Sequence, residues 1–387
     1  MTSWMRKLLG NPVATLLKVL VVLAALDWWV RGPFVDSYVA ARYVKPFAIL
    51  HDRTGGRDLP IFFGALARRS TGVRIAFVGD STMNAVDGLD TTNIPYLTGE
   101  ELRARLGRND LEAIDASEIG LYGGDALLFI DKLLGAGADV VVYGASLRAL
   151  PRYPVTQYVS RIGSELSPAD VLRLARAGGS TWLIDNLTAE QVLSGAVRSS
   201  WATYAYRSSL RSWLWEGAAQ PLVQQWPALQ AALQPAPLQQ PVAVAPRLPK
   251  AHAYEWSRDD YGGLNANGRA LELIGQLCRR YAPGRCVLYA GPVNPLGREA
   301  LADPGLYEEY LAFLRVLAGR SGLIWRDYSD TMTPADFRPP RYGGLRDPIH
   351  LNEAGRAKLA QLLAQPVAEA IGNVTAVGTG TTKRRAQ

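Results

Sequence analysis

The stretch from residue 73 to residue 81 reads VRIAFVGDS. An apolar run leads directly into Gly79-Asp80-Ser81, and this pattern predicts a buried strand that ends in a tight turn. Similar apolar runs recur further along the chain, separated by segments with helical spacing. Alternating buried strands and helices indicate an α/β domain whose parallel sheet is covered by helices on both faces.

Working outward from this stretch, the pattern predicts five strands, at 73–78, 111–116, 139–143, 285–290 and 322–327. It predicts helices at 98–106, 125–134, 265–280, 304–318 and 352–371. A Thr-x-x-Glu capping box, Thr98 to Glu101, marks the start of the first helix. The sheet domain therefore comprises 70–150 and 262–371.

Residues 151–261 interrupt this domain as a predicted helical insertion, in which 234–250 form a proline-rich, extended linker. The polar tail 373–387 is predicted to be disordered. Tryptophans and arginines lie close together in the insertion, and three interpretations stay open: packing onto the sheet domain, contact with lipid headgroups or a partner, and stacking on sugar rings. The residues concerned are Trp201, Trp213, Trp215, Tyr206, Arg207 and Arg211.

The overall composition narrows the class of protein. The 387 residues are 48% hydrophobic and 20% charged, which excludes a disordered, collagen-like or multi-span membrane chain. The net charge of +7 suits an anionic surface or polymer, but scattered arginines and the absence of DNA-binding motif spacing argue against nucleic acid as a partner. Three histidines and two cysteines form no ligand cluster, so we expect neither a metal nor a cofactor.

The amino-terminal segment 12–30 reads PVATLLKVLVVLAALDWWV. It is long enough to cross a membrane as a helix, with two basic residues before it and two tryptophans at its end. We therefore predict that 1–35 form a cytoplasmic end and an uncleaved, single-pass anchor in the bacterial inner membrane, with the body in the periplasm. A cleaved signal peptide and a buried helix of a soluble protein are the alternatives.

The two cysteines bear on the same question of compartment. Cys278 and Cys286 are eight residues apart, at the end of a predicted helix and the start of a predicted strand. Outside the cytoplasm a disulfide between them can persist. A bridge and two buried free thiols are both open at this stage.

Side chains that could take part in catalysis follow the predicted strands. Ser81 comes after the first strand, and Asp347 and His350 come after the last strand, before the final helix. Because the carboxyl ends of parallel strands share one edge, these residues should meet there. A serine, a histidine and a carboxylate are the parts of a nucleophile, its general base and the group that orients the base. The simpler interpretation is that Ser81 and Asp347 only cap helices.

An oxyanion would need hydrogen-bond donors at the same edge. Ser81 is expected at the start of a helix, where free backbone N–H groups favour negative charge. Gly120 and Gly123 follow the second strand and could bring further N–H groups close to a reacting carbonyl. Ser146 follows the third strand.

These motifs resemble the SGNH (GDSL-like) hydrolase superfamily. Gly79-Asp80-Ser81 matches its first block, Asp347-Pro348-Ile349-His350 its fifth, and Leu351-Asn352-x-x-Gly355 the usual continuation into the last helix. The resemblance implies a three-layer αβα, flavodoxin-like fold with a five-stranded parallel sheet. It also implies a triad of Ser81, Asp347 and His350, with Gly120, or failing that Gly123, in the oxyanion hole.

The third block departs from the family pattern. Where the family has Gly-x-Asn-Asp, this chain has Gly144-Ala145-Ser146-Leu147. The missing asparagine would help to hold the oxyanion. Ser146, Asn84 or backbone donors alone are the three ways in which this chain could replace it.

At a finer level, the chain resembles membrane-tethered members that work beside membrane-bound O-acyltransferases, such as the alginate acetylation proteins and the D-alanyl transfer protein of teichoic acid synthesis. This resemblance implies a serine O-acyltransferase that modifies, by O-acetylation, an exported or cell-envelope polysaccharide through an acyl-Ser81 intermediate. Its partners would be that polysaccharide and a membrane-bound O-acyltransferase. The alternatives are a periplasmic carbohydrate or lipid esterase, and a catalytically idle anchored scaffold.

Overall fold

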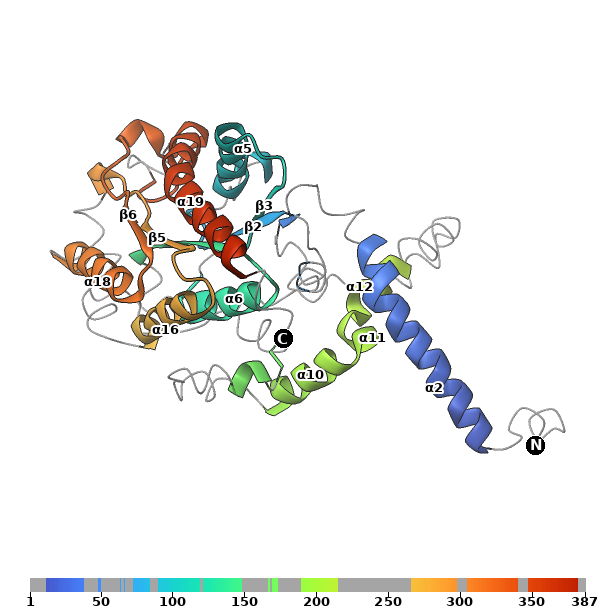
Figure 1. Ribbon diagram of the computed structural model, residues 1–387. Helices are drawn as coiled ribbons and strands as arrows, with labels where there is room; N and C mark the ends of the chain where they lie inside the picture. Colours follow the sequence, from blue (N-terminus) through green and yellow to red (C-terminus); the bar gives the residue numbers. More distant parts are fainter. Residues whose placement is uncertain are drawn as a thin grey trace, which may run out of the picture.

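A computed structural model shows a central sheet between helices, with further helices at one side (Figure 1). The residues that the structure describes are 12–37, 48–49, 63, 66, 72–83, 90–118, 121–147, 166–167, 169–172, 189–214, 266–297, 305–339 and 347–381.

All five predicted strands are present, and each lies next to its sheet neighbours in parallel orientation. A two-residue edge strand, β1, adds a sixth, so the sheet order is β1-β3-β2-β4-β5-β6. Without β1, this is the 2-1-3-4-5 order of flavodoxin-like folds, in which ligands bind where the strand order reverses, here between β2 and β4. The strands are β1 (Ala48–Ile49), β2 (Val73–Gly79), β3 (Leu111–Asp115), β4 (Val140–Ala145), β5 (Cys286–Ala290) and β6 (Ile324–Asp327).

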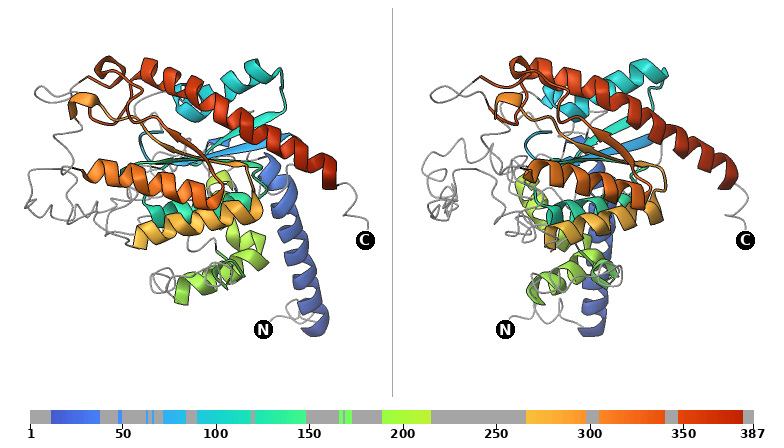
Figure 2. Two further views of the ribbon diagram at one scale, coloured as in Figure 1. Left: turned by 60° about the vertical axis from the view of Figure 1, so that its left-hand side comes forward. Right: turned by 90° about the vertical axis from the view of Figure 1, so that its left-hand side faces the viewer.

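Helices cover both faces of this sheet, which confirms the predicted α/β layering (Figure 2). Alternate side chains of β2 explain why both faces need cover: Ile75 and Phe77 pack into one apolar cluster, and Ala76 and Val78 into the other. One face carries α5 (Ile94–Leu106) and α19 (Glu353–Thr381), and the other carries α6 (Gly123–Gly135), α16 (Ala266–Tyr281) and α18 (Leu306–Ser321).

Helix α5 begins earlier than the sequence pattern indicated. Asn93 is its N-cap, since the Asn93 side chain accepts a hydrogen bond from the Tyr96 N–H at 2.9 Å, and Pro95 lies in the first turn. Thr98 is buried inside the helix. The predicted Thr98–Glu101 capping box is therefore wrong, because an asparagine followed by a proline starts the helix one turn upstream.

Helix α19 also runs further than predicted, to Thr381. Asn373 fixes the helix to the turn before β5, since its side-chain amide donates to the Gly284 carbonyl at 2.6 Å. The prediction of a disordered tail is thus wrong for 373–381, and 382–387 lie outside the described residues.

The amino-terminal segment forms helix α2 (Pro12–Trp29), followed by a π-helical turn, η1 (Val30–Phe34). Among the residues that the structure describes, no helix combines the length and the apolar character needed to cross a membrane.

The insertion contributes helices α10 (Ala189–Ser200), α11 (Ala202–Ala205) and α12 (Arg207–Leu214), of which α11 and α12 lie beside the end of α2 (Figure 1). Asp27 of α2 accepts a hydrogen bond from the Thr203 N–H at 2.9 Å and so caps α11 from another helix. Arg31 pairs with Asp27 and donates to the Ser200 carbonyl. Asp27, the charged residue near the end of the predicted anchor, therefore connects α2 to the insertion. We call this contact region between α2 and the insertion the joint.

Aromatic packing completes this joint. The ring of Trp213 lies 5.9 Å from that of Trp29 and 5.8 Å from that of Phe34. Trp213 thus contacts the end of α2 and not the sheet domain, and it remains partly accessible to solvent. Trp201 is also exposed, and it stacks on Tyr204. Trp215 and the proline-rich linker lie outside the described residues.

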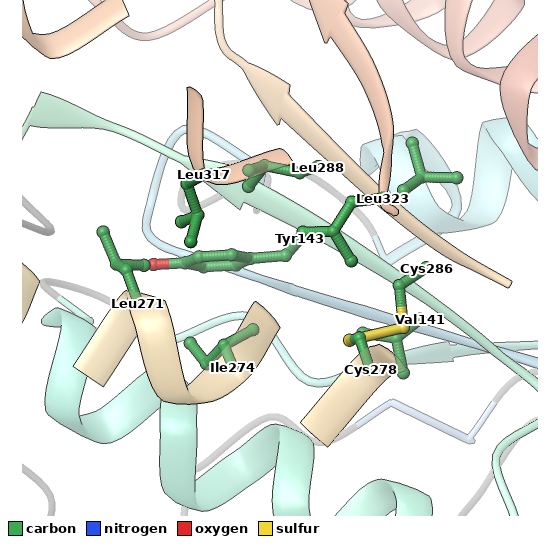
Figure 3. Close-up of a pocket in the computed structure, with 10 residues that line it drawn as sticks. Val141, Tyr143, Leu271, Ile274, Cys278, Cys286, Leu288, Leu317 and Leu323 are labelled. Atoms are coloured by element: carbon green, nitrogen blue, oxygen red, sulfur yellow. A yellow bond between two sulfur atoms is a disulfide. The ribbon is translucent and has the colours of Figure 1, made fainter. Parts of the chain in front are cut away.

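Cys278 at the end of α16 and Cys286 at the start of β5 are joined in a disulfide, with their Cα atoms 6.0 Å apart. The bridge borders a small apolar cavity into which Tyr143 points (Figure 3). The Tyr143 hydroxyl has no hydrogen-bond partner within the described part of the chain, and burial raises its pKa. Because only aliphatic residues and the disulfide join Tyr143 in the lining, this cavity offers no catalytic group.

Candidate active site

The turn after β2 places Ser81 at the edge of the sheet. The Met83 N–H donates to the Asp80 carbonyl at 3.1 Å, and the Thr82 N–H donates to Asp80 Oδ1 at 2.9 Å. Residues 81–83 therefore form a hydrogen-bonded turn. The helix expected to start at Ser81 would continue through 84–89, which lie outside the described residues. In 81–83 the Asp80 carboxylate and carbonyl accept from the local N–H groups.

Three predicted residues meet at this edge. Ser81 Oγ lies 2.9 Å from His350 Nε2, although the two residues are 269 positions apart. On the other side of the ring, His350 Nδ1 lies 2.9 Å from Asp347 Oδ2 and 3.0 Å from Oδ1. Ser81 is 5% exposed, so its hydroxyl is largely shielded from water. The arrangement is that of a nucleophile, a base and an orienting carboxylate.

Asp347 is held in its ionised form. Partial burial raises its pKa, but hydrogen bonds from the His350 ring, the His350 N–H and the Ile349 N–H more than offset this, and the pKa falls to about 2. A carboxylate that stays charged at neutral pH can accept from His350 Nδ1 and leave Nε2 free to face Ser81.

The turn that carries Asp347 and His350 is fixed by the segment before it. The Asp347 N–H donates to the Arg338 carbonyl at 3.2 Å, and the Arg338 N–H donates to the His350 carbonyl at 3.0 Å. Asn352 then caps α19, since its Oδ1 accepts from the Gly355 N–H at 2.9 Å. The continuation of the motif, Leu351-Asn352-x-x-Gly355, thus anchors the triad turn to the last helix.

Ser146, one candidate for the place of the missing third-block asparagine, contacts a carboxylate in this structure. Its hydroxyl donates to Asp80 Oδ2 at 2.5 Å, and Asp80 is 2% exposed. In this structure the Ser146 hydroxyl is therefore engaged by the buried Asp80 carboxylate, and its role as an oxyanion donor stays a prediction. Ser146 ties the end of β4 to the turn that carries Ser81.

Backbone donors are the other oxyanion candidates. Within the described residues, the Ser81 N–H donates to no acceptor, and the same is true of Gly123 at the first turn of α6. The segment after β3 is attached to the nucleophile turn, since the Glu118 N–H donates to the Gly79 carbonyl at 2.9 Å. Gly120 and Asn84 lie outside the described residues, as do His51 and His252.

One residue that sequence reasoning missed also lies at this edge. Asn294 follows β5 and contacts the backbone of Asp347 and Pro348. Its position after a predicted strand was the available signal, because every such position falls on the same sheet edge. No group of three or more metal-ligating side chains occurs in the described part of the chain.

No family model and no curated protein sequence matches the chain. Solved structures that are similar to it include LAE5, an α/β hydrolase enzyme from the metagenome of Lake Arreo, Spain (13% identity, TM-score 0.38, covering 78% of this chain and 98% of that one). Others are the lipase/acylhydrolase from Enterococcus faecalis (12%, 0.39, 76% and 95%) and the acetyl xylan esterase AlAXEase (15%, 0.37, 77% and 100%). Likenesses this weak show neither a shared family nor a shared activity.

Proposed function

We propose that the protein is a serine acyltransferase that uses Ser81 as its nucleophile. The observation that carries the proposal is the continuous contact from Ser81 Oγ to His350 Nε2, at 2.9 Å, and from His350 Nδ1 to the Asp347 carboxylate, at 2.9 Å. Capping a helix does not require a serine to contact a histidine that is itself oriented by a carboxylate, whereas nucleophilic catalysis does. All three residues of this set are present, which argues against an idle scaffold.

The first half of the reaction acylates the enzyme. Ser81 Oγ attacks the carbonyl carbon of a donor ester or thioester, and its proton moves to His350 Nε2 as the new C–O bond forms. The Asp347 carboxylate stabilises the resulting imidazolium through Nδ1–H. When the tetrahedral intermediate collapses, the bond to the donor's leaving atom breaks, and that atom takes the proton from Nε2. The acyl group remains on Ser81.

The second half transfers the acyl group. An acceptor hydroxyl gives its proton to Nε2 and attacks the acyl carbonyl, and Ser81 Oγ leaves with that proton. If the acceptor is a sugar hydroxyl the protein is a transferase, and if it is water the protein is an esterase. The chemistry of the enzyme is the same in both cases, so the acceptor alone separates the two functions.

We further propose that the acceptor is an exported or cell-envelope polysaccharide, that the acyl group is acetyl, and that a membrane-bound O-acyltransferase supplies it. The support is the resemblance of the sequence motifs to tethered acetylation proteins. The disulfide between Cys278 and Cys286 supports an oxidising compartment outside the cytoplasm. Exposed apolar side chains along α2, such as Leu16, Leu17 and Val22, support attachment of this helix to a membrane.

The test uses the purified full chain with p-nitrophenyl acetate, with and without a soluble oligosaccharide. We expect release of p-nitrophenolate and an acetyl-Ser81 peptide in mass spectrometry. Ser81→Ala, His350→Ala and Asp347→Asn should each lower the rate by about 10³-fold or more, without additivity between them. Acetylated oligosaccharide would identify a transferase, and acetate alone an esterase.

Ser329→Ala is the matched control. Ser329 is a buried serine that follows β6 and donates to Asp327, so it lies at the same sheet edge without contacting a histidine. We expect it to keep the wild-type rate. Wild-type activity in folded Ser81→Ala protein would refute the proposed function.

A further inference from the structure

Asn294 is a buried polar residue in the segment that follows β5. It is 1% exposed, and its N–H, its carbonyl, its Oδ1 and its Nδ2 each make a hydrogen bond. Its Oδ1 accepts from the Leu296 N–H at 3.1 Å and its carbonyl accepts from the Gly297 N–H at 2.9 Å, so the residue sits in a compact turn of its own. Its remaining donors point out of this turn.

Both of those donors bind the turn that carries the triad. The Asn294 N–H donates to the Pro348 carbonyl at 2.8 Å, and its Nδ2 donates to the Asp347 carbonyl at 3.3 Å. Pro348 has no N–H of its own, so its carbonyl is its only backbone hydrogen-bonding group. One asparagine thus satisfies two successive carbonyls of the segment between Asp347 and His350.

The triad turn is therefore held from two directions. Arg338 binds the two ends of the turn through backbone hydrogen bonds, and Asn294 binds its middle. The Arg338 contacts are made by backbone atoms and survive side-chain replacement, whereas one Asn294 contact depends on its amide group. Misplacement of a catalytic group by about 1 Å can lower the rate by about 10²-fold. These contacts of Asn294 and Arg338 should therefore affect the reaction rate and not only the stability of the fold.

We propose that Asn294 is a positioning residue for the triad: its amide and N–H hold the backbone of Asp347 and Pro348 so that the carboxylate meets His350 Nδ1. This inference rests on the proposed function, because it assigns a role within the same site. Asn294 touches no reacting atom in this role, and it acts only through Asp347.

The chain offers a matched control in Asn93. This asparagine is also fully buried, its Oδ1 also accepts from a backbone N–H, that of Tyr96, and its Nδ2 donates to Asp115. Asn93→Ala and Asn294→Ala therefore remove equivalent groups, one at the cap of α5 and one beside the triad. Both should lower the urea midpoint, since each leaves buried partners unsatisfied.

The experiment measures steady-state hydrolysis of p-nitrophenyl acetate and the rate at which a fluorophosphonate labels Ser81, on folded full-length protein. In that labelling the Ser81 oxygen bonds to phosphorus, fluoride leaves, and the hydroxyl proton passes to His350. For Asn294→Ala we expect kcat and the labelling rate to fall about tenfold or more, with KM changed less than about twofold. For Asn93→Ala we expect both rates to stay at the wild-type value.

Asn294→Asp gives a second variant if Asn294→Ala does not fold. It keeps the shape of the side chain and an acceptor for Leu296, and it replaces the donor to the Asp347 carbonyl with a carboxylate oxygen, which also adds a negative charge. Equal rates in the wild type and in the folded Asn294 variant would overturn the positioning role while Ser81→Ala stays inactive. Equal rates in the wild type and Ser81→Ala would instead overturn the proposed function, and the positioning role with it.

Discussion

At the scale of single residues, the role of each carboxylate in the site depends on the groups that donate hydrogen bonds to it. Asp80 and Asp347 both lie in or beside a turn at this edge of the sheet. Asp80 accepts from Ser146 and from its own turn, which makes it a structural anchor. Asp347 accepts from the His350 ring, which makes it the orienting group of the triad. The partners, and not the residue type, decide the role.

The lowered pKa of Asp347 predicts a dependence of stability on pH. Its pKa is about 2 in the folded protein against 3.8 in the unfolded chain, so folding favours the ionised form. The resulting contribution, about 2 kcal/mol, is fully present above about pH 5 and is lost as the pH falls through 3.8 towards 2. Urea unfolding of wild type and Asp347→Asn should therefore differ less at pH 2 than at pH 6. A difference that is independent of pH would contradict this assignment.

At the scale of elements, the start of α19 joins the triad turn to the sheet domain. Asn352 caps the helix and also donates through Nδ2 to the carbonyls of Ala335 and Phe337. Gly355, in the first turn, lies against the backbone of Asp336: a Cβ placed there would meet the Asp336 carbonyl oxygen at 2.3 Å. The glycine of the motif is thus explained by a close approach of two backbone segments.

Gly355→Ala should consequently destabilise the protein by about 1–3 kcal/mol, because the neighbouring atoms are backbone and cannot move aside without distorting the segment that holds the triad turn. Gly372→Ala, later in the same helix, is the control, since nothing lies within 4 Å of its Cβ position. That change should be neutral or slightly stabilising, as alanine favours helix. Urea midpoints of the two variants measure the difference, and equal midpoints would count against the close-approach explanation.

At the scale of the whole molecule, the chain consists of the sheet domain and a joint between α2 and the insertion. Asp27, Arg31 and Trp213 hold that joint together. A disulfide between Cys278 and Cys286 cross-links α16 and β5 within the sheet domain. The location proposed above, outside the cytoplasm at a membrane, rests on this bridge and on the exposed apolar side chains of α2.

The proposed location predicts the behaviour of the full chain in bacterial cells. We expect it to sediment with membranes in high salt. We also expect the bridge to be formed in the cell, so that Cys278 and Cys286 become alkylated only after a reductant is added. Loss of the bridge should cost about 2–3 kcal/mol of stability, from the larger entropy of the unfolded chain. Replacing both cysteines by alanine gives the matched measurement. Free thiols in freshly lysed cells, or protein in the soluble fraction, would contradict the proposed location.

The sequence alone determined the five main strands and the meeting of Ser81, Asp347 and His350. Apolar runs that end in turn residues are local signals, and parallel strands bring their carboxyl ends to one edge whatever the connections are. The residues of the triad could therefore be predicted without knowing how the helices and strands pack together.

Only the tertiary structure decided which side chains form hydrogen bonds with residues that are distant in the sequence. Ser146 binds Asp80, which is 66 positions away, and Asn294 binds the turn at Asp347, which is 53 positions away. The same holds for Asp27, which caps a helix 176 positions later. A hydrogen bond acts over about 3 Å, so its partner is set by how the packed elements approach one another, and no sequence period records that approach.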